Sequence, residues 1–184
     1  MQLSEQLVLV TGGARGLGER IVQAFSKQGA RVVINYHQSQ QAAEQLATTH
    51  GPDRALAVQA DVTDPAQVAA MFDTAQTHFD APITTVVNNA LVDFSFNGDA
   101  RPGPADIRWE HFDTQLAGSV RGALNTVQAA LPGMRDQAFG RIINIGTNLF
   151  QNPVVPYHDY TAAKAALLSL TRTLAADLGP HDIT

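Results

Sequence analysis

Cysteine is absent from the 184-residue sequence, which excludes disulfides, thiolate metal sites and a catalytic thiol. No apolar run is long enough to span a bilayer, and Met1–Glu5 lack the basic and apolar regions of a signal peptide. Basic residues are scarce: 12 Lys and Arg stand against 17 Asp and Glu. The net charge of -5 argues against nucleic acid or an anionic membrane as the main partner. The histidines are scattered, with no pair at ligand spacing on one helix, so we expect no metal site. These absences favour a cytoplasmic protein.

The residues that are present predict one globular domain over residues 1–184. An apolar share of 45% and a charged share of 16% are typical of a globular protein rather than a disordered one. Short apolar runs alternate with longer helical patterns, which is the signature of repeated βαβ units. With right-handed crossovers, this alternation predicts an α/β fold with a doubly wound parallel sheet of the Rossmann type.

The expected elements follow from apolar periodicity and from Gly and Pro positions. The expected strands cover residues 7–10, 31–35, 55–60, 84–87 and 141–145. The expected helices cover residues 16–28, 40–49, 65–79, 111–131 and 160–178, with Pro132–Gly133 stopping the fourth. Residues 91–106 are rich in Gly, Pro, Asn and Asp and predict a long surface loop, a kind of segment that is often functional.

A glycine-rich stretch, Thr11–Gly18, joins the first strand to its helix. A tight turn, close approach of backbone N–H groups to a pyrophosphate, and a helix N-terminus all favour glycine here. Gly12, Gly16 and Gly18 fit these needs with Leu17 between them, although their spacing differs from GxGxxG. The alternative is a glycine-rich turn that only packs.

Polar residues follow two of the expected strands. Asn88, Asn89 and Ala90 end the fourth strand, where the side-chain amides can tie neighbouring strand ends together; an ordinary polar turn is the alternative. Asp61 and Val62 end the third strand, where the carboxylate could meet an adenine amino group. A helix-capping role for Asp61 is an equal alternative.

Tyr160 and Lys164 are four residues apart on the last expected helix, so they lie on one face. A nearby ammonium favours the phenolate and lowers the pKa of the phenol, which makes the pair a tunable acid. Such an acid can give a proton to a carbonyl oxygen. The alternative is a chance occurrence on an Ala-rich helix.

Taken together and in this order, Thr-Gly-x-x-x-Gly-x-Gly, Asn-Asn-Ala and Tyr-x-x-x-Lys resemble the short-chain dehydrogenase/reductase family over the whole chain. The resemblance implies binding of NAD(H) or NADP(H) and hydride transfer to or from a carbonyl or alcohol carbon. It also implies that Tyr160 donates or accepts the proton. Lys164 is expected to hold the nicotinamide ribose and to lower the Tyr160 pKa.

Further positions follow from the family pattern, with departures. The family serine thirteen residues before the tyrosine is Thr147 here, which keeps the hydroxyl. Ser119 replaces the asparagine of the family's Asn-x-x-Gly, a residue that helps to hold a water of the proton relay. Leu91 stands where glycine usually follows Asn-Asn-Ala, which puts a bulky side chain near the cofactor.

The cofactor is expected to be NADP(H). Tyr36 ends the second strand where NAD binders usually carry a carboxylate, so nothing there repels a 2′-phosphate. Arg15 can pair with that phosphate and Ser39 can donate to it. The run Val33–Ser39 resembles the 3-oxoacyl-[acyl-carrier-protein] reductase branch, which implies an NADPH-dependent carbonyl reductase of fatty acid biosynthesis. Its substrate would be a small carbonyl or alcohol, including one on acyl carrier protein. The alternative is a nucleotide-binding sensor or scaffold with lost or weak turnover.

Two expectations concern the end of the chain and its assembly. The sequence stops at Thr184, where family members enter a sixth strand, so we expect the retained part of a longer protein. The fold would be truncated after the helix that follows strand five, leaving that strand as an exposed edge. The last two helices carry more Ala, Val and Leu than one buried stripe requires, and the resemblance implies a homotetramer built on them.

Overall fold

A five-stranded parallel sheet forms the centre of the computed structural model, which describes residues 1–184. The strands are β1 (Leu7–Val10), β2 (Arg31–Tyr36), β3 (Ala55–Gln59), β4 (Thr85–Asn88) and β5 (Arg141–Asn144). Their order in the sheet is β3-β2-β1-β4-β5, and every neighbouring pair is parallel. The direction of winding therefore reverses between β1 and β4, which confirms the doubly wound sheet. Ligands of such sheets bind at the carboxyl ends of the strands beside this reversal.

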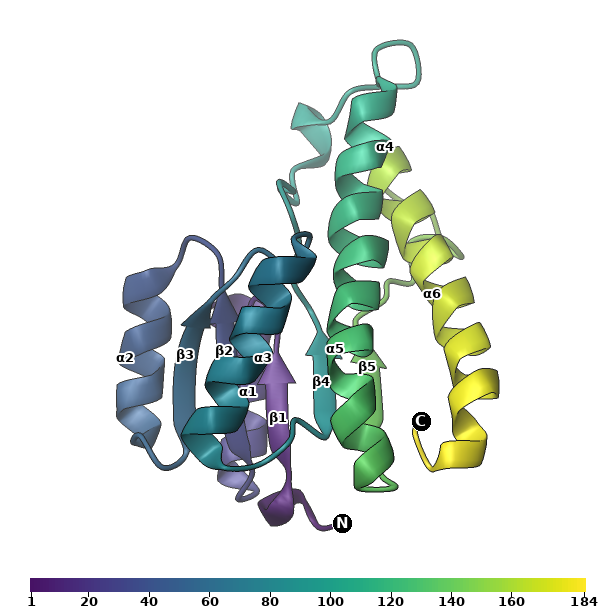
Figure 1. Ribbon diagram of the computed structural model, residues 1–184. Helices are drawn as coiled ribbons and strands as arrows, with labels where there is room; N and C mark the ends of the chain where they lie inside the picture. Colours follow the sequence, from purple (N-terminus) through teal and green to yellow (C-terminus); the bar gives the residue numbers. More distant parts are fainter.

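Helices cover both faces of the sheet (Figure 1). They are α1 (Gly16–Lys27), α2 (Gln40–His50), α3 (Pro65–Phe79), α4 (Trp109–Leu116), α5 (Gly122–Asp136) and α6 (His158–Leu178). Side chains of β1 alternate between the two faces, because successive residues of a strand point in opposite directions. Val8 and Val10 pack with the apolar residues of α1 and α2, whereas Leu7 and Leu9 belong to the core formed with α3, α5 and the end of α6.

The start of α3 shows how the sequence fixes a helix boundary. The Asp64 carboxylate accepts hydrogen bonds from the backbone N–H groups of Ala66 and Gln67, and Pro65 occupies the first helical position. The cap saturates N–H groups that have no partner inside the helix, and proline loses no bond there. The cap and helix expected from Thr63–Pro65 are confirmed.

One expected helix differs from the structure at both ends. Instead of residues 111–131, a continuous helix runs from Trp109 to Asp136, with a π-helical segment at Ala117–Arg121 between α4 and α5. The expected stop at Pro132–Gly133 is wrong, because Pro132 lies inside α5. Proline costs one backbone hydrogen bond, but Ala130 and Met134 on either side of it are buried in the core and hold the helix together. In Figure 1 this long helix rises well above the carboxyl edge of the sheet, beside the first half of α6.

The outer edge of β5 is partly paired, which corrects the exposed edge expected from the sequence. Gly140 and Ile183 form a parallel bridge, and the N–H of Ile142 donates to the carbonyl of Thr184 at 2.8 Å. Ile183 is fully buried in the core. The residues after α6 therefore run beside β5 and supply backbone partners to it. No helix of the structure has the length and apolar character needed to cross a membrane.

Candidate active site

The residues singled out in the sequence lie at or near the carboxyl edge of the sheet. They lie in the β1–α1 loop and the first turn of α1, at or just after the ends of β2, β3, β4 and β5, in the π segment, and in the first half of α6. They are Gly12, Arg15, Gly16, Leu17, Gly18, Tyr36, Ser39, Asp61, Val62, Asn88, Ala90, Ser119, Thr147, Tyr160 and Lys164. The parallel topology brings these positions to one edge of the sheet, since all five strands end on the same side.

The glycine loop has the shape that a diphosphate requires. Gly12 and Gly16 have left-handed φ angles of 60° and 57°, which non-glycine residues rarely adopt. A Cβ on Gly18 would lie 2.2 Å from the carbonyl oxygen of Gly12, so only glycine lets α1 pack this close to the loop. A Cβ on Gly16 meets nothing within 4 Å, so the loop faces open space at the start of α1. Free N–H groups of a first helical turn beside open space fit an anionic ligand.

Asn35 holds this loop in place, and the sequence reasoning missed it. Its side-chain oxygen accepts from the N–H of Gly12 at 3.2 Å, and its amide nitrogen donates to the carbonyl of Ala60 at 3.0 Å. The Asn35 carbonyl also accepts from the N–H of Gly13. A buried polar residue in an otherwise apolar strand was the available signal, because such a group needs partners.

Thr11 and Asn89 join β4 to the glycine loop. The Thr11 hydroxyl accepts from the N–H groups of Asn89 and Ala90, at 2.9 and 3.0 Å. The Asn89 amide donates to the carbonyls of Thr11 and Gly12, at 2.9 and 3.1 Å. The strand-tying role expected of the asparagines is what these bonds provide.

Asn88 continues the ties toward the helices. Its amide donates to Asn144 Oδ1 at 2.8 Å, and its own oxygen accepts from the Thr126 hydroxyl at 2.7 Å. Asn144 in turn donates to the Thr171 hydroxyl at 2.8 Å. A polar chain thus links α5, β4, β5 and α6 beneath the site. Neither Asn144 nor Thr171 belongs to a recognisable sequence motif, so these two hydrogen bonds could not be predicted.

Tyr160 and Lys164 are both buried on α6, on the same face as expected. Burial raises the pKa of the Tyr160 phenol, and the side chain of Thr147 acts in the opposite direction. The lowered phenol pKa expected from the Tyr160–Lys164 pair is therefore wrong for this structure, because burial has the larger effect and the Thr147 hydrogen bond offsets only part of it. Lys164 donates to the carbonyl of Ile145 at 2.7 Å, and its Nζ lies 5.8 Å from the centre of the Tyr160 ring. Burial lowers the pKa of the Lys164 ammonium to about 8.

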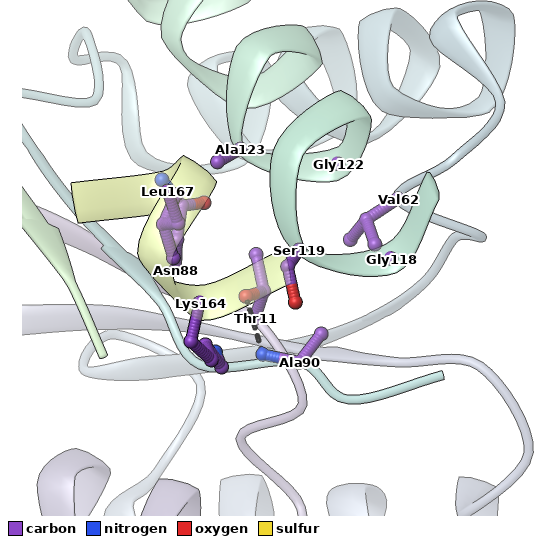
Figure 2. A pocket seen from close by; sticks show the side chains of 10 residues that line it. All are labelled: Thr11, Val62, Asn88, Ala90, Gly118, Ser119, Gly122, Ala123, Lys164 and Leu167. Carbon is purple, nitrogen blue, oxygen red and sulfur yellow. Dashed lines mark hydrogen bonds between the residues drawn. The ribbon is translucent and has the colours of Figure 1, made fainter. Parts of the chain in front are cut away.

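Ser119 and Lys164 line one small pocket between the strand ends and the long helix (Figure 2). The other lining residues are Thr11, Val62, Asn88, Ala90, Gly118, Gly122, Ala123 and Leu167. Ser119 is buried in the π segment, a type of helical irregularity that is frequent at functional sites. The pocket places a hydroxyl and an ammonium beside the end of β4. Tyr160 and Thr147 do not line this pocket.

The residues expected around the adenosine half of the cofactor have clear local roles. Asp61 Oδ1 accepts from both the N–H and the hydroxyl of Thr63 at 2.8 Å, so the carboxylate shapes the turn before α3. Ser39 is the N-cap of α2, yet its side chain makes no capping bond. Arg15 is exposed, and Tyr36 is buried at the end of β2. The exposed Arg15 guanidinium therefore lies on the segment after β1, and the Ser39 hydroxyl lies on the segment after β2.

Residues 91–106 form the expected long loop, apart from a short 3-10 helix at Gly98–Ala100. Val92 packs against Gly118, where an added Cβ would come within 2.8 Å of it, and Leu91 is 37% exposed. Further along the loop, the Phe94 ring stacks on the Tyr160 ring, with centroids 4.5 Å apart and planes at 27°. This contact was not foreseen from the sequence. It places a loop side chain against the expected catalytic residue.

Comparison with known proteins decides the family. The family model for short chain dehydrogenases matches residues 6–184. This chain belongs to that family. The enzyme class expected from the sequence, an NAD(P)-dependent short-chain dehydrogenase/reductase, is thereby confirmed.

Individual family members agree with this assignment over nearly the whole chain. NADPH-dependent aldehyde reductase 2, chloroplastic, of Arabidopsis thaliana is 32% identical, over 99% of this chain and 70% of its own length. The structure of a blue fluorescent protein from a metagenomic library in complex with NADPH matches with a TM-score of 0.86 at 33% identity, over 100% of this chain and 73% of that one. The structure of 3-ketoacyl-(acyl-carrier-protein) reductase from Brucella melitensis complexed with NADH matches with a TM-score of 0.88 at 29% identity, over 98% and 72%.

Proposed function

We propose that this short-chain dehydrogenase/reductase is an NADPH-dependent carbonyl reductase in which Tyr160 gives the proton to the carbonyl oxygen. The observation that carries the proposal is that Tyr160 and Lys164 share one face of α6, and that Lys164 lines a pocket with Thr11 and Asn88 at the ends of β1 and β4. This is where a doubly wound sheet binds a dinucleotide. A relative named an NADPH-dependent aldehyde reductase and a structure holding NADPH support the cofactor.

The cofactor would lie along the carboxyl edge of the sheet, with its diphosphate at the glycine loop. The open space beside Gly16 fits that group, and the exposed Arg15 and the free hydroxyl of Ser39 suit a 2′-phosphate. Asp61 and Val62 would border the adenine, and Lys164 the ribose of the nicotinamide half. When bound, the nicotinamide supplies the hydride that reduces the carbonyl carbon.

The protein's own residues manage the proton. The Tyr160 phenol is protonated at neutral pH, as a proton donor must be, and because burial raises its pKa it is a weaker acid than a free phenol. The Thr147 hydroxyl would donate a second hydrogen bond to the oxygen as negative charge develops on it. Lys164, with a pKa of about 8, can exchange protons near neutral pH, and Ser119 shares its pocket. These two groups would return the proton to Tyr160.

The substrate is proposed to be a ketone or an aldehyde. A 3-oxoacyl thioester on acyl carrier protein, and hence a role in fatty acid biosynthesis, is supported by the solved 3-ketoacyl reductase. An aldehyde is supported by the name of the Arabidopsis relative. A homotetramer and a cytoplasmic location complete the proposal, although the Arabidopsis relative is a chloroplastic protein and the location stays a prediction.

The test follows nicotinamide absorbance while NADPH is mixed with the protein and either an aldehyde or a β-ketoacyl thioester. Wild type should oxidise NADPH, and Tyr160→Phe should lose about 10²-fold or more in rate while NADPH binding, measured by calorimetry, survives. Equal rates in wild type and Tyr160→Phe would remove Tyr160 from the proposal. NADPH binding without oxidation of any carbonyl compound would instead favour the alternative, a nucleotide-binding sensor or scaffold.

A further inference from the structure

Four aromatic rings gather where the loop after β4 meets the start of α6. Phe94 stacks on Tyr160, and Phe96 meets both of them edge-on, with centroids 5.0 Å from Phe94 and 5.8 Å from Tyr160. Tyr157 lies edge-on to Phe94 at 5.2 Å. Tyr157 and Tyr160 are buried, whereas Phe96 is 64% exposed. The cluster therefore surrounds the Tyr160 ring and also presents an open aromatic surface beside it.

A buried ion pair fastens this loop to α6. Arg101 pairs with Asp159, the residue next to Tyr160, and the Asp159 side chain is only 2% exposed. The Arg101 guanidinium also lies over the Phe94 ring, 4.6 Å from its centre. Arg101 thus contacts both the helix that carries Tyr160 and the ring that stacks on Tyr160. Breaking a buried pair leaves an uncompensated charge, so this contact fixes the loop firmly.

We propose that Phe94 and Phe96, held beside Tyr160 by the Arg101–Asp159 pair, form the substrate-facing wall and give the enzyme a preference for carbonyl compounds that carry a flat aryl group. The inference rests on the proposed function, since it takes Tyr160 as the group that meets the carbonyl oxygen. A carbonyl held at Tyr160 places its substituent next to the rings that adjoin Tyr160. A flat aryl substituent can stack on them or meet them edge-on, which an alkyl chain cannot do.

The magnitude of the preference follows from aromatic pairing. An aromatic pair contributes beyond buried area by an amount equivalent to about two- to tenfold in kcat/KM. Area burial alone would favour any apolar substituent, so the informative comparison is between groups of similar size and different planarity. An aryl preference would rank aryl aldehydes and ketones above 3-oxoacyl thioesters as substrates.

The experiment uses the full chain with NADPH and two aldehydes, benzaldehyde and cyclohexanecarbaldehyde. Wild type should reduce the aryl compound with a kcat/KM about two- to tenfold higher. Phe94→Leu should lose this preference, measured as the ratio of kcat/KM for the two aldehydes. Phe139→Leu is the matched control. Phe139 lies at the amino end of β5, away from the carboxyl ends of the strands, and its ring contacts the Arg141 guanidinium, so this variant should keep the preference. No aryl preference in wild type, or its survival in Phe94→Leu, would overturn the proposal.

The ion pair is tested by conservative rescue. Arg101→Lys retains the charge opposite Asp159 and should keep the aryl preference, whereas Arg101→Gln should lose it. Circular dichroism establishes that each variant is folded. Equal preferences in folded Lys and Gln variants would remove the ion pair from the proposal. If Arg101→Gln does not fold, the aryl preferences of Phe94→Leu and Phe139→Leu decide whether the aromatic wall exists.

Binding of the matching alcohols separates this inference from the proposed function. NMR titration of the wild type with benzyl alcohol and cyclohexylmethanol, in the presence of NADP⁺, needs no turnover. Tighter binding of benzyl alcohol that Phe94→Leu removes supports the aromatic wall, even if Tyr160→Phe turns out to be fully active. Equal binding of both alcohols refutes the wall, even if Tyr160 proves to be the proton donor.

Discussion

Lys164 donates a hydrogen bond to the carbonyl oxygen of Ile145 at 2.7 Å, which ties the middle of α6 to the residue that follows β5. The lysine residue is only 2% exposed and forms no ion pair. Its pKa is lowered to about 8 because burial disfavours the charged form. The fold therefore holds an ammonium where the protein interior disfavours it, which agrees with the role in the chemistry at Tyr160 that we propose for Lys164.

Replacing Lys164 should make the protein more stable near neutral pH. The unfolded lysine has a pKa near 10.5 and the folded one near 8, so the unfolded state binds more protons between these values. Wild-type stability from this group is lowest below pH 8 and rises as the pH increases toward 10.5. Lys164→Met should exceed wild type by about 1–3 kcal/mol at pH 7, and the gap should close by pH ~10. Urea unfolding at both pH values measures the difference in unfolding free energy between variant and wild type. A difference that widens with pH would contradict the lowered pKa of Lys164.

Alanine at two neighbouring glycines should have very different effects. Gly18→Ala drives a Cβ to 2.2 Å from the Gly12 carbonyl oxygen and should cost about 3 kcal/mol. Gly16→Ala meets open space and should cost about 1–2 kcal/mol, for the left-handed φ alone. Urea denaturation of both variants provides the comparison. Equal losses would mean that the loop can move away from α1.

The rate of carbonyl reduction should depend more on Thr147, which replaces the family serine, than on Ser119, which replaces the family asparagine. Thr147→Val removes the hydroxyl that we propose donates to the developing alkoxide, and it should cost about 10²–10³ in kcat. Ser119→Ala should cost less than about tenfold, because a second water can replace a short side chain in a pocket. NADPH binding should survive both changes. Turnover of Thr147→Val at the wild-type rate would show that Tyr160 works alone.

Arg15 should determine the choice between NADPH and NADH. Arg15→Ala should weaken NADPH binding by about tenfold and leave NADH binding nearly unchanged, because only NADPH carries the 2′-phosphate. Arg20→Ala is the control: Arg20 is exposed on α1 and bonds to Gln23. Calorimetry gives two dissociation constants for each protein, one for NADPH and one for NADH. A parallel loss for both cofactors would point to a general effect on the glycine loop.

Self-association should occur through the exposed faces of α5 and α6. Ala162 and Ala165 are exposed on α6, and Leu124 on α5 is 37% exposed, which leaves small apolar residues facing outward. Light scattering at micromolar concentration should report a tetramer, and Ala165→Arg should reduce its mass. Ala69→Arg, on an exposed part of α3, should not. A wild-type monomer would refute the prediction.

Strong local signals let the sequence predict most of the fold. The glycine loop, the Asp64 cap and the alternation of apolar runs each have a direct physical cause, so the doubly wound parallel sheet and most element boundaries could be anticipated. The run through Pro132 could not, because burial of Met134 and Ala130 overrides the local cost of proline. The π segment around Ser119 leaves no trace in the apolar pattern either.

The site was predictable as a set of residue types and much less so as a set of contacts. Tyr160, Lys164 and Thr147 could be placed by spacing, but the pKa of Tyr160 depends on how many atoms cover it. Phe94 and Arg101 lie in a loop with no periodic pattern, so nothing in the sequence links them to α6. The role of Asn35 could not be predicted, because the sequence does not show that Gly12 and Ala60 both lie within hydrogen-bond distance of its side chain.

The amide bond between Asn88 and Asn144 also sets the alignment of two strands. These residues are partners in the register of β4 and β5. Successive side chains of a strand point to opposite faces, so a slip of one residue would turn one amide away and break the bond between them. The hydrogen bond between the two side chains therefore favours this register of β5 over registers shifted by one residue. Because Thr147 lies three residues after the end of β5, the alignment of β5 also fixes where the Thr147 hydroxyl meets α6, which is at Tyr160.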